Sequence, residues 1–373
     1  MSDLLREDDG NKIYWGNKNK IDTLIDYVNK GINILKMGSG SFGTGYLVAV
    51  KITHKDYHKE GESSYELIPY DDEVEETNGP YGIRLYLVKK THSKDKVALL
   101  NRGNLTDLKL QFIKEVDASI EFRQKIPSYV TRIKGARWNN EGPDYIIYNY
   151  IKGKTLKEYL NILFREFDYK ISGQDFNSHH TYNPNTVQYS LLKEYYDNLC
   201  YLWCALEKAN LALSNIGWSH SDIKPDNLMF KVELGDKGKF YNWASARCWL
   251  IDFGGATQFG HTINTFTRDY SPFSNYGMCT PESKNPARSI RVSPNRAIRL
   301  TNYTKDFDYD NAHIVMTPEY NAVSRDIIWN CDMAKLFFNY AEFKIPTCKT
   351  SSRGGFNKTR TKRRRSRKFR KDI

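Results

Sequence analysis

Apolar residues alternate with other residues over short stretches of the first 150 positions, a period typical of β-strands. Strands are predicted at residues 32–52, as two runs joined by a glycine-rich turn, and at residues 81–90, 129–138 and 144–151. Helical spacing replaces this alternation at residues 20–31 and again at residues 105–125. The first part of the chain is therefore predicted to be β-rich with two helices.

The second part of the chain has mainly helical periodicity. Residues 155–167 and 189–213 carry apolar residues at the spacing of a helix. Two strand-like runs follow at residues 227–232 and 248–251, and residues 233–247 between them are interpreted as an extended polar turn. A β-rich unit followed by a helical one predicts the α+β class.

Composition places the chain among ordinary globular proteins. Of its 373 residues, 40% are hydrophobic and 27% charged, which is enough for a sizeable core. The amino end is charged, and no run of about 18 apolar residues occurs, so we expect neither secretion nor a membrane span. Six cysteines lack metal-site spacing, and Cys200 and Cys204, four apart in a helical pattern, are interpreted as buried thiols. We expect an intracellular, reducing compartment, either cytoplasmic or nuclear.

The net charge of +12 is concentrated at the carboxyl end. Residues 349–373 contain 12 Lys or Arg against one Asp, which gives +11 in 25 residues. Because like charges repel and only Phe356 and Phe369 could be buried, residues 346–373 are predicted to be a disordered basic tail. The tail is expected to bind DNA or RNA, or to act as a nuclear-localisation signal, since it attracts polyanions at moderate salt.

A carboxylate, a lysine and an amide follow the long helical pattern at fixed spacing, as Asp222, Lys224 and Asn227. Asp252 comes 30 positions after Asp222, at the end of an apolar run, and opens the triplet D-F-G. Phosphoryl transfer needs a carboxylate near the attacking hydroxyl, a cation on the transferred phosphate and oxygen ligands for Mg²⁺. These four side chains supply all three.

The motifs resemble those of eukaryotic-type serine/threonine protein kinases over about residues 32–340. The resemblance implies that Asp222 is the catalytic base and that Lys224 contacts the γ-phosphate. It also implies that Asn227 and Asp252 hold the metal ions. Expected cofactors are ATP and Mg²⁺, with Mn²⁺ as a substitute, and the expected partner is a protein substrate.

The resemblance also implies a two-lobed, protein-kinase-like fold of the α+β class, with a shortened carboxyl end. The expected parts are an N-terminal extension with a short helix (1–30), a small β-rich lobe (31–150) with an acidic insertion at about 55–80, a larger helical lobe (151–345) with insertions at about 168–187 and 233–247, and the basic tail (346–373). The short tail with Gly-Gly-Phe and many Lys or Arg resembles the tails on divergent kinases of large double-stranded DNA viruses, which adds a virion-associated location to the expectations.

A glycine-rich segment in the first pair of strands matches G-x-G-x-x-G. Absent side chains there let backbone N–H groups approach phosphate oxygens. The residues expected to bind the nucleotide are Gly38, Ser39, Gly40, Ser41, Phe42 and Gly43. Kinases usually have a valine two residues later, where this chain has Gly45, so a more mobile loop is expected.

Two lysines compete for the role of anchoring the α- and β-phosphates. Lys51 lies in the motif letters V-A-V-K, but it follows Gly43 by only eight residues. That length is too short for a second strand, a turn and a third strand. Lys89 in the run at residues 81–90 is therefore preferred, with Lys90 as its outward neighbour.

The resemblance implies further contacts of the nucleotide site. Glu115, in the helix predicted at residues 105–125, would pair with Lys89, and Glu121 is the alternative. Tyr148 would be the gatekeeper. The residues whose backbone groups would bind the adenine edge are Asn149, Tyr150 and Ile151.

Regulatory and structural roles follow from the same resemblance. Ser221 stands where many kinases have an arginine that contacts a phosphorylated activation loop, so activation by such phosphorylation is not expected to be required. His220 is expected to be structural, close to D-F-G. Either Glu319 or Glu282 could close the activation segment, and Glu319 is preferred because it precedes Asp332, the expected start of an anchoring helix, by thirteen residues.

Two other functions stay open at this point. An inactive kinase-fold scaffold associated with nucleic acid is favoured by Gly45, the competing lysines and the short carboxyl end, and is opposed by the intact Asp222 and Asp252. A small-molecule kinase is favoured if a peptide-binding surface is absent. Opposite charge also suggests the hypothesis that the acidic residues 60–76 fold back on the basic tail. The oligomeric state is not predicted.

Overall fold

The computed structural model describes residues 6–31, 33–39, 43–54, 63–71, 73–77, 81–91, 105–171, 187–235, 240–263, 314–316, 318–333, 346 and 348. The predictions for Gly40, Ser41, Phe42, Glu282 and residues 349–373 lie outside these ranges.

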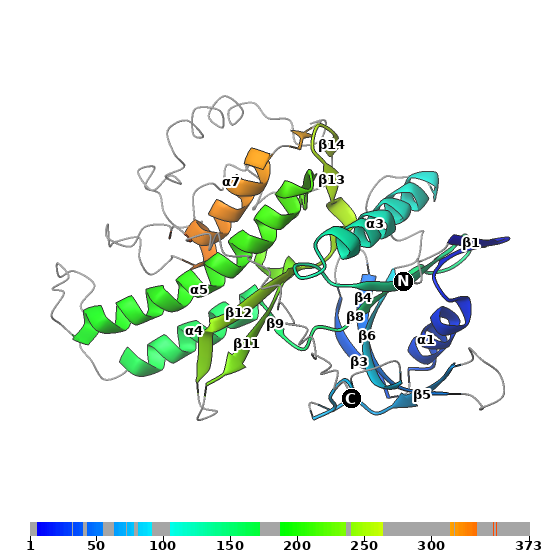
Figure 1. Ribbon diagram of the computed structural model, residues 1–373, viewed down its shortest axis with the longest axis horizontal. Helices are drawn as coiled ribbons and strands as arrows, with labels where there is room; N and C mark the ends of the chain where they lie inside the picture. The colour runs from blue at the N-terminus through cyan, green and yellow to red at the C-terminus, as the bar shows by residue number, and fades with distance from the viewer. Residues whose placement is uncertain are drawn as a thin grey trace, which may run out of the picture.

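One antiparallel sheet of eight strands dominates the first part of the chain (Figure 1). The strand order is β1-β2-β7-β8-β6-β4-β3, and β5 also pairs with β4. The strands are β1 Arg6–Asp9, β2 Lys12–Trp15, β3 Leu35–Ser39, β4 Gly43–His54, β5 Ser63–Ile68, β6 Gly82–Thr91, β7 Ile133–Asn139 and β8 Tyr145–Asn149. All the strands predicted for this part are therefore present, with three additional ones.

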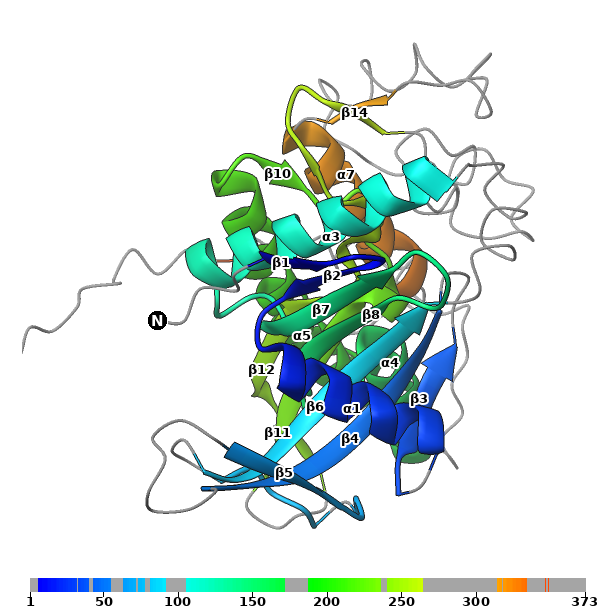
Figure 2. The ribbon, with the colours of Figure 1, turned by 90° about the vertical axis from the view of Figure 1, so that its right-hand side faces the viewer.

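A helix covers each face of this sheet. Helix α1 (Lys18–Lys30) lies across one face (Figure 2), and α3 (Leu105–Lys125) covers the other. Successive residues of β8 are buried on opposite faces, since Ile147 packs in the cluster with α1 and Ile146 in the cluster with α3. Burial on both faces explains why β8 has four successive buried residues, Tyr145, Ile146, Ile147 and Tyr148.

The N-terminal extension is part of the sheet. The predicted polar leader contains the hairpin β1–β2, and β2 pairs with β7 in the register Ile13↔Trp138 and Trp15↔Ala136. Ile13 and Trp15 pack with α3, whereas Tyr14 packs with α1. The extension therefore contributes to both cores.

The second part of the chain is built on helices α4 (Leu156–Ile171), α5 (Val187–Asn215) and α7 (Pro318–Ile328), which lie together in Figure 1. The ring centroids of Trp203 and Trp329 lie 5.3 Å apart in its buried core. The predicted α+β class and the predicted helices are confirmed. None of the helices in the described ranges is long and apolar enough to cross a membrane.

The polar turn predicted at residues 233–247 is mostly strand. Strands β11 (Leu228–Leu234) and β12 (Tyr241–Leu250) pair in a long antiparallel hairpin that packs against α5. Trp243 is 5% exposed, and its ring lies 5.9 Å from that of Tyr159 on α4. The prediction was wrong because Trp243 is the one buried residue among residues 241–247, and the other six are exposed or only partly buried, so no apolar alternation marks the strand.

Short elements connect these parts. They are β9 Lys154–Thr155, β10 Trp218–Ser219, η1 Pro225–Asn227, η2 Phe253–Gly255, β13 Thr257–Gln258, β14 Thr262–Ile263, β15 Ile314–Val315 and the π-helical turn η5 Trp329–Met333. Strand β9 pairs with β11, β10 with β13, and β14 with β15.

A disulfide joins Cys204 on α5 to Cys348, with a Cα–Cα distance of 5.5 Å. The interpretation of Cys204 as a free buried thiol is therefore wrong, and the expectation of a reducing compartment loses its support, since disulfides are rare there. Cys200 is free and half-buried. Cys348 packs against the core of the second part, so the chain is fixed two residues beyond the predicted start of the tail.

Candidate active site

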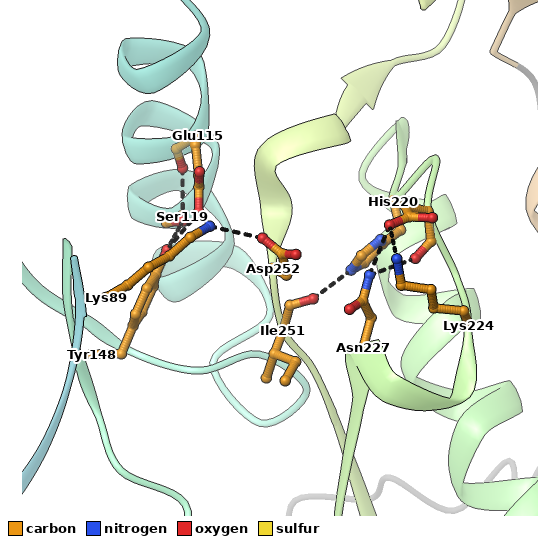
Figure 3. A network of polar contacts seen from close by, with 10 residues as sticks. Lys89, Glu115, Ser119, Tyr148, His220, Lys224, Asn227, Ile251 and Asp252 are labelled. Atoms are coloured by element: carbon orange, nitrogen blue, oxygen red, sulfur yellow. Dashed lines mark hydrogen bonds and ion pairs between the residues drawn. The ribbon is translucent and has the colours of Figure 1, made fainter. Parts of the chain in front are cut away.

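Lys89 on β6 lies between two carboxylates from different parts of the chain (Figure 3). Its Nζ is 2.8 Å from Glu115 Oε1 on α3 and 2.8 Å from Asp252 Oδ1. The side chain of Lys89 is 20% exposed and that of Glu115 is 10% exposed. The lysine and glutamate predicted to pair are thus brought together, and Asp252 joins them.

The neighbouring charges keep Lys89 protonated and Asp252 deprotonated. Burial acts to lower the pKa of Lys89, but the carboxylates of Asp252 and Glu115 raise it well above its usual value. Lys89 in turn lowers the pKa of Asp252. Burial raises the pKa of Glu115, partly offset by Lys89, so Glu115 depends on the lysine for its negative charge.

The competing residues lie elsewhere. Lys51 is exposed on β4, where its register partners are Glu66 and Ile83. Lys90 donates a hydrogen bond to Asn29 Oδ1 on α1, at 3.0 Å. Its place on the opposite face from Lys89 follows from the alternation along a strand.

Asp252 adopts a strained backbone conformation directly after β12. Its φ of 64° and ψ of 76° lie in the left-handed region, which non-glycine residues rarely adopt. Phe253 follows as a fully buried ring, 5.0 Å from Phe122 on α3 and 5.4 Å from His220. Packing of Phe253 therefore holds Asp252 in a conformation that points its carboxylate at Lys89.

Asp222, Lys224 and Asn227 form a second cluster on the loop between β10 and β11. Lys224 Nζ is 2.8 Å from Asp222 Oδ2. Asn227 Nδ2 donates to the carbonyl oxygen of Asp222 at 2.9 Å and to its Oδ2 at 3.0 Å. The turn η1 begins at Pro225, whose fixed φ suits a first helical position, and it turns Asn227 back toward Asp222. The side chain of Asp222 is 19% exposed, so it can meet a substrate.

His220 ties the loop to the strand that carries Asp252. Its Nε2–H donates to the carbonyl oxygen of Ile251 at 2.9 Å, and the residue is fully buried (Figure 3). The expectation of a structural histidine near D-F-G agrees with this geometry. Ser221 has a φ of 67°, and its hydroxyl donates to Met316 Sδ at 3.4 Å. The position of Ser221 is buried and has a strained backbone.

Asn321 on α7 fixes the start of the same loop, a role that was not predicted from the sequence. Its Oδ1 accepts a hydrogen bond from Ser219 Oγ at 2.6 Å. Its Nδ2 donates to Ser214 Oγ and to the carbonyl oxygen of Trp218, both at 2.9 Å. No local pattern marks this residue, because its partners lie more than 100 positions earlier in the chain.

The segment after Asp252 returns to the site at Met316. Strands β14 and β15 pair, and the backbone of Met316 bonds to that of His261 and Gly260 at 2.9 Å and 3.0 Å. Glu319 lies in the first turn of α7, and Asp332 lies in η5. The preferred Glu319 comes four residues after the end of β15, and Glu282 lies outside the described residues.

Three of the six glycine-rich residues expected to bind the nucleotide, Gly38, Ser39 and Gly43, lie in the described ranges. Gly38 and Ser39 on β3 pair with Gly45 and Thr44 on β4. A Cβ at Gly43 would come within 2.5 Å of the carbonyl oxygen of Lys90, so this position requires glycine. The first two glycine-rich residues and Gly43 are therefore on adjacent strands near the strand of Lys89.

The residues expected to bind the adenine edge, Asn149, Tyr150 and Ile151, are called the hinge, and they differ in their backbone hydrogen bonds. The N–H of Asn149 donates to the carbonyl oxygen of Arg132 at 2.9 Å, and the N–H of Tyr150 donates to that of Leu85 at 3.0 Å. Within the described ranges, the N–H of Ile151 has no backbone acceptor. Of the three amides, that of Ile151 is the donor available to an adenine edge. Tyr148, the predicted gatekeeper, donates to Glu115 Oε1 at 3.4 Å.

Asp252 and Asn227 could hold Mg²⁺. Both supply hard oxygen atoms, and the side chain of Asp252 is 41% exposed. Because the amide nitrogen of Asn227 faces Asp222, its amide oxygen points to the side on which Asp252 lies (Figure 3). Mg²⁺ commonly takes one or two protein oxygens and completes its shell with water and phosphate. The donor set fits that ion.

Acid is expected to destabilise the protein through His220. Burial lowers the pKa of His220, so the folded state binds its proton less readily than the unfolded state does. The stabilisation is present above the unfolded pKa of about 6.5 and is lost as the pH falls below it, by at most about 1.4 kcal/mol per pH unit. Urea midpoints at about pH 7.5 and 5.5 measure this loss.

His220→Gln keeps a hydrogen-bond donor without a titrating ring, and His261→Gln, at an exposed histidine, is the control. The first variant should lose less stability on acidification than the wild type. An equal loss in both variants would contradict this assignment.

No protein-family model matches the chain, and no curated protein matches it.

Proposed function

We propose that the chain is a serine/threonine protein kinase that transfers the γ-phosphate of Mg-ATP to a protein hydroxyl. The observation that carries the proposal is the position of Lys89, held at 2.8 Å from both Glu115 and Asp252. In this proposal the sheet with α1 and α3 is the small lobe of a two-lobed kinase-like fold. The helices α4, α5 and α7 with the hairpin β11–β12 form the large lobe.

The two clusters divide the chemistry between them. Asp222 would orient the substrate hydroxyl and take its proton as the oxygen bonds to the γ-phosphorus, while the bond to the β–γ bridging oxygen breaks and ADP leaves. Lys224 would turn from Asp222 to the γ-phosphate oxygens, and Lys89 would hold the α- and β-phosphates. Mg²⁺, held by Asp252 and Asn227, supplies charge neutralisation on the phosphates.

Activity is proposed not to require phosphorylation of the activation segment. The place of the usual arginine is taken by Ser221, which is 3% exposed. Its hydroxyl donates to Met316 Sδ, and its backbone N–H donates to Ser219 Oγ within the loop. No cation at this position calls for a phosphate partner. The loop is instead fixed by Asn321 and by the hydroxyl of Tyr320, which donates to the carbonyl oxygen of Ser221 at 3.3 Å.

The test is transfer of labelled γ-phosphate from Mg-ATP to a mixture of basic and acidic proteins by the full chain. We expect phosphoserine or phosphothreonine, and the same rate after the enzyme has been treated with a phosphatase. If Mg-ATP raises the melting temperature but no phosphate is transferred or consumed, the inactive scaffold replaces the kinase. Consumption of ATP only when small hydroxylated metabolites are added, with no labelled protein, would point to a small-molecule kinase.

A further inference from the structure

A cavity of about 850 Å³ lies behind the hinge, and none of Lys89, Asp222 and Asp252 lines it. Its walls come from the hinge, the segment before β7, helix α5 and the hairpin β11–β12. This volume is within the range of small-molecule and nucleotide sites, about 300–1,000 Å³. The cavity therefore does not include the catalytic clusters, although it shares the residues Asn149, Tyr150 and Ile151 with the expected nucleotide site.

Five cationic side chains from these four walls line the cavity: Arg132, Lys152, Lys208, Lys231 and Arg247. In the described part of the chain, Arg132, Lys208, Lys231 and Arg247 take part in no ion pair. The cavity contains two carboxylates, of Glu75 and Glu76, and Glu76 Oε1 accepts a hydrogen bond from the N–H of Leu85 at 3.1 Å. The cavity thus has an excess of positive charge.

Two of these cations are placed directly opposite each other. Lys231 on β11 and Arg247 on β12 are register partners in the antiparallel hairpin. Like charges at such a position destabilise a sheet, because their Cβ atoms lie only about 5 Å apart. An anion bound in the cavity would remove this repulsion, and phosphate suits the guanidinium and ammonium groups.

Aromatic rings are interleaved with the cations. The cavity is lined by Tyr129, Tyr150, Tyr201 and Trp249, and Tyr201 is 47% exposed. Cationic side chains that follow a phosphate backbone, combined with rings on which bases stack, are typical of sites for single-stranded nucleic acid. An inorganic anion would need no such rings.

The disulfide brings the start of the basic tail to this cavity. Cys204 is one of the lining residues, and it is bonded to Cys348, the residue before the 25 that carry 12 Lys or Arg. Because these basic residues follow Cys348 in the chain, a polyanion that binds them would be held close to the cavity. The tail and the cavity are therefore both expected to bind a polyanion.

We propose that the cavity behind the hinge binds single-stranded nucleic acid, with phosphates on Lys208, Lys231 and Arg247 and a base stacked on Tyr201. No residue of the two catalytic clusters lines the cavity, and the hinge residues Asn149, Tyr150 and Ile151 are the part of the expected nucleotide site that it borders. Glu75 and Glu76, from the acidic residues 60–76, line the same cavity as Cys204.

The experiment measures fluorescence anisotropy of a labelled oligothymidylate of about 12 nucleotides with the full chain, at several salt concentrations and without ATP. Lys231→Gln with Arg247→Gln should raise Kd at least tenfold and make the salt dependence shallower by about 1.4, since each lost phosphate contact on a single strand contributes about 0.7. Tyr201→Ala should raise Kd roughly tenfold through lost stacking.

Lys208→Gln should weaken binding, whereas Lys193→Gln on the same helix, at an exposed lysine paired with Asp197, should not. Circular dichroism checks that each variant folds. Unchanged binding by the Lys231→Gln and Arg247→Gln double variant, with complete loss when residues 349–373 are removed, would assign nucleic acid to the tail alone and overturn the proposal. Equal affinity for a duplex of the same length would also overturn it, because paired bases cannot stack on Tyr201.

Discussion

Asp222→Asn is expected to lower kcat for phosphate transfer by about 10²–10⁴-fold, the contribution typical of a positioned general base. The amide keeps the size of the carboxylate but cannot take the proton of the substrate hydroxyl. Lys224 Nζ would also lose the negative partner that lies 2.8 Å away, so the loop could rearrange. Initial rates at saturating Mg-ATP and protein substrate measure the change, and the melting temperature shows whether the fold is kept.

Asp226→Asn is the matched control for this loss. Asp226 lies on the same loop, but its side chain is 54% exposed and pairs with Lys157 at 3.3 Å. Exposed pairs of this kind contribute little to stability, so the control should retain nearly normal activity. Equal losses in the two variants would show that the loop conformation, and not the carboxylate of Asp222, sets the rate.

The sequence predicted the main helices and the central strands because their apolar residues are periodic over many positions. It missed hairpin β1–β2 because β1 is a polar edge strand and β2 has only four residues. The available signal in the sequence was the pair Gly10-Asn11, which is typical of a two-residue hairpin turn. In the structure Gly10 has the positive φ, 56°, that such a turn requires. Strand β5 within the predicted insertion was missed for a similar reason, since its side chains are only partly buried.

Pairing between distant cysteines cannot be predicted from spacing. Cys204 and Cys348 are 144 residues apart, and the helical position of Cys204 indicated only that it would be buried. Their proximity depends on how the chain returns to α5 after α7. The same limit applies to Asn321, whose partners are set by tertiary packing and not by any local pattern.

The choice between lysines shows where spacing arguments succeed. The sequence excluded Lys51 because eight residues cannot form a strand, a turn and a second strand. In the structure, Gly43 and Lys51 lie on the single strand β4, and β6 follows after β5. Chain length alone therefore separated the two candidates, although the motif letters favoured the other one.

Lys89→Met is expected to lower kcat about 10²–10³-fold, comparable with removal of one preorganised group that stabilises transition-state charge. It is also expected to lower the free energy of unfolding by about 3 kcal/mol, the lower end for breaking a buried ion pair, because Lys89 still reaches solvent. The loss of stability is caused by Glu115, whose side chain is 10% exposed. In the variant, this carboxylate would stay buried but would no longer have a positively charged partner. Lys51→Met and Lys90→Met should leave the rate nearly unchanged.

A double-mutant cycle separates the two effects of Lys89. Adding Glu115→Gln to Lys89→Met removes the uncompensated carboxylate, so stability should recover by about 1–3 kcal/mol while the rate stays low. The recovery is expected because burial raises the pKa of Glu115, and Lys89 and the hydrogen bonds of the site are what lower it. Without Lys89, a neutral amide is therefore less costly to bury than the carboxylate. Urea unfolding and initial rates of all four proteins complete the cycle. Stability that does not recover would mean that Lys89 is held chiefly by Asp252, and Glu115 would then have only a packing role in α3.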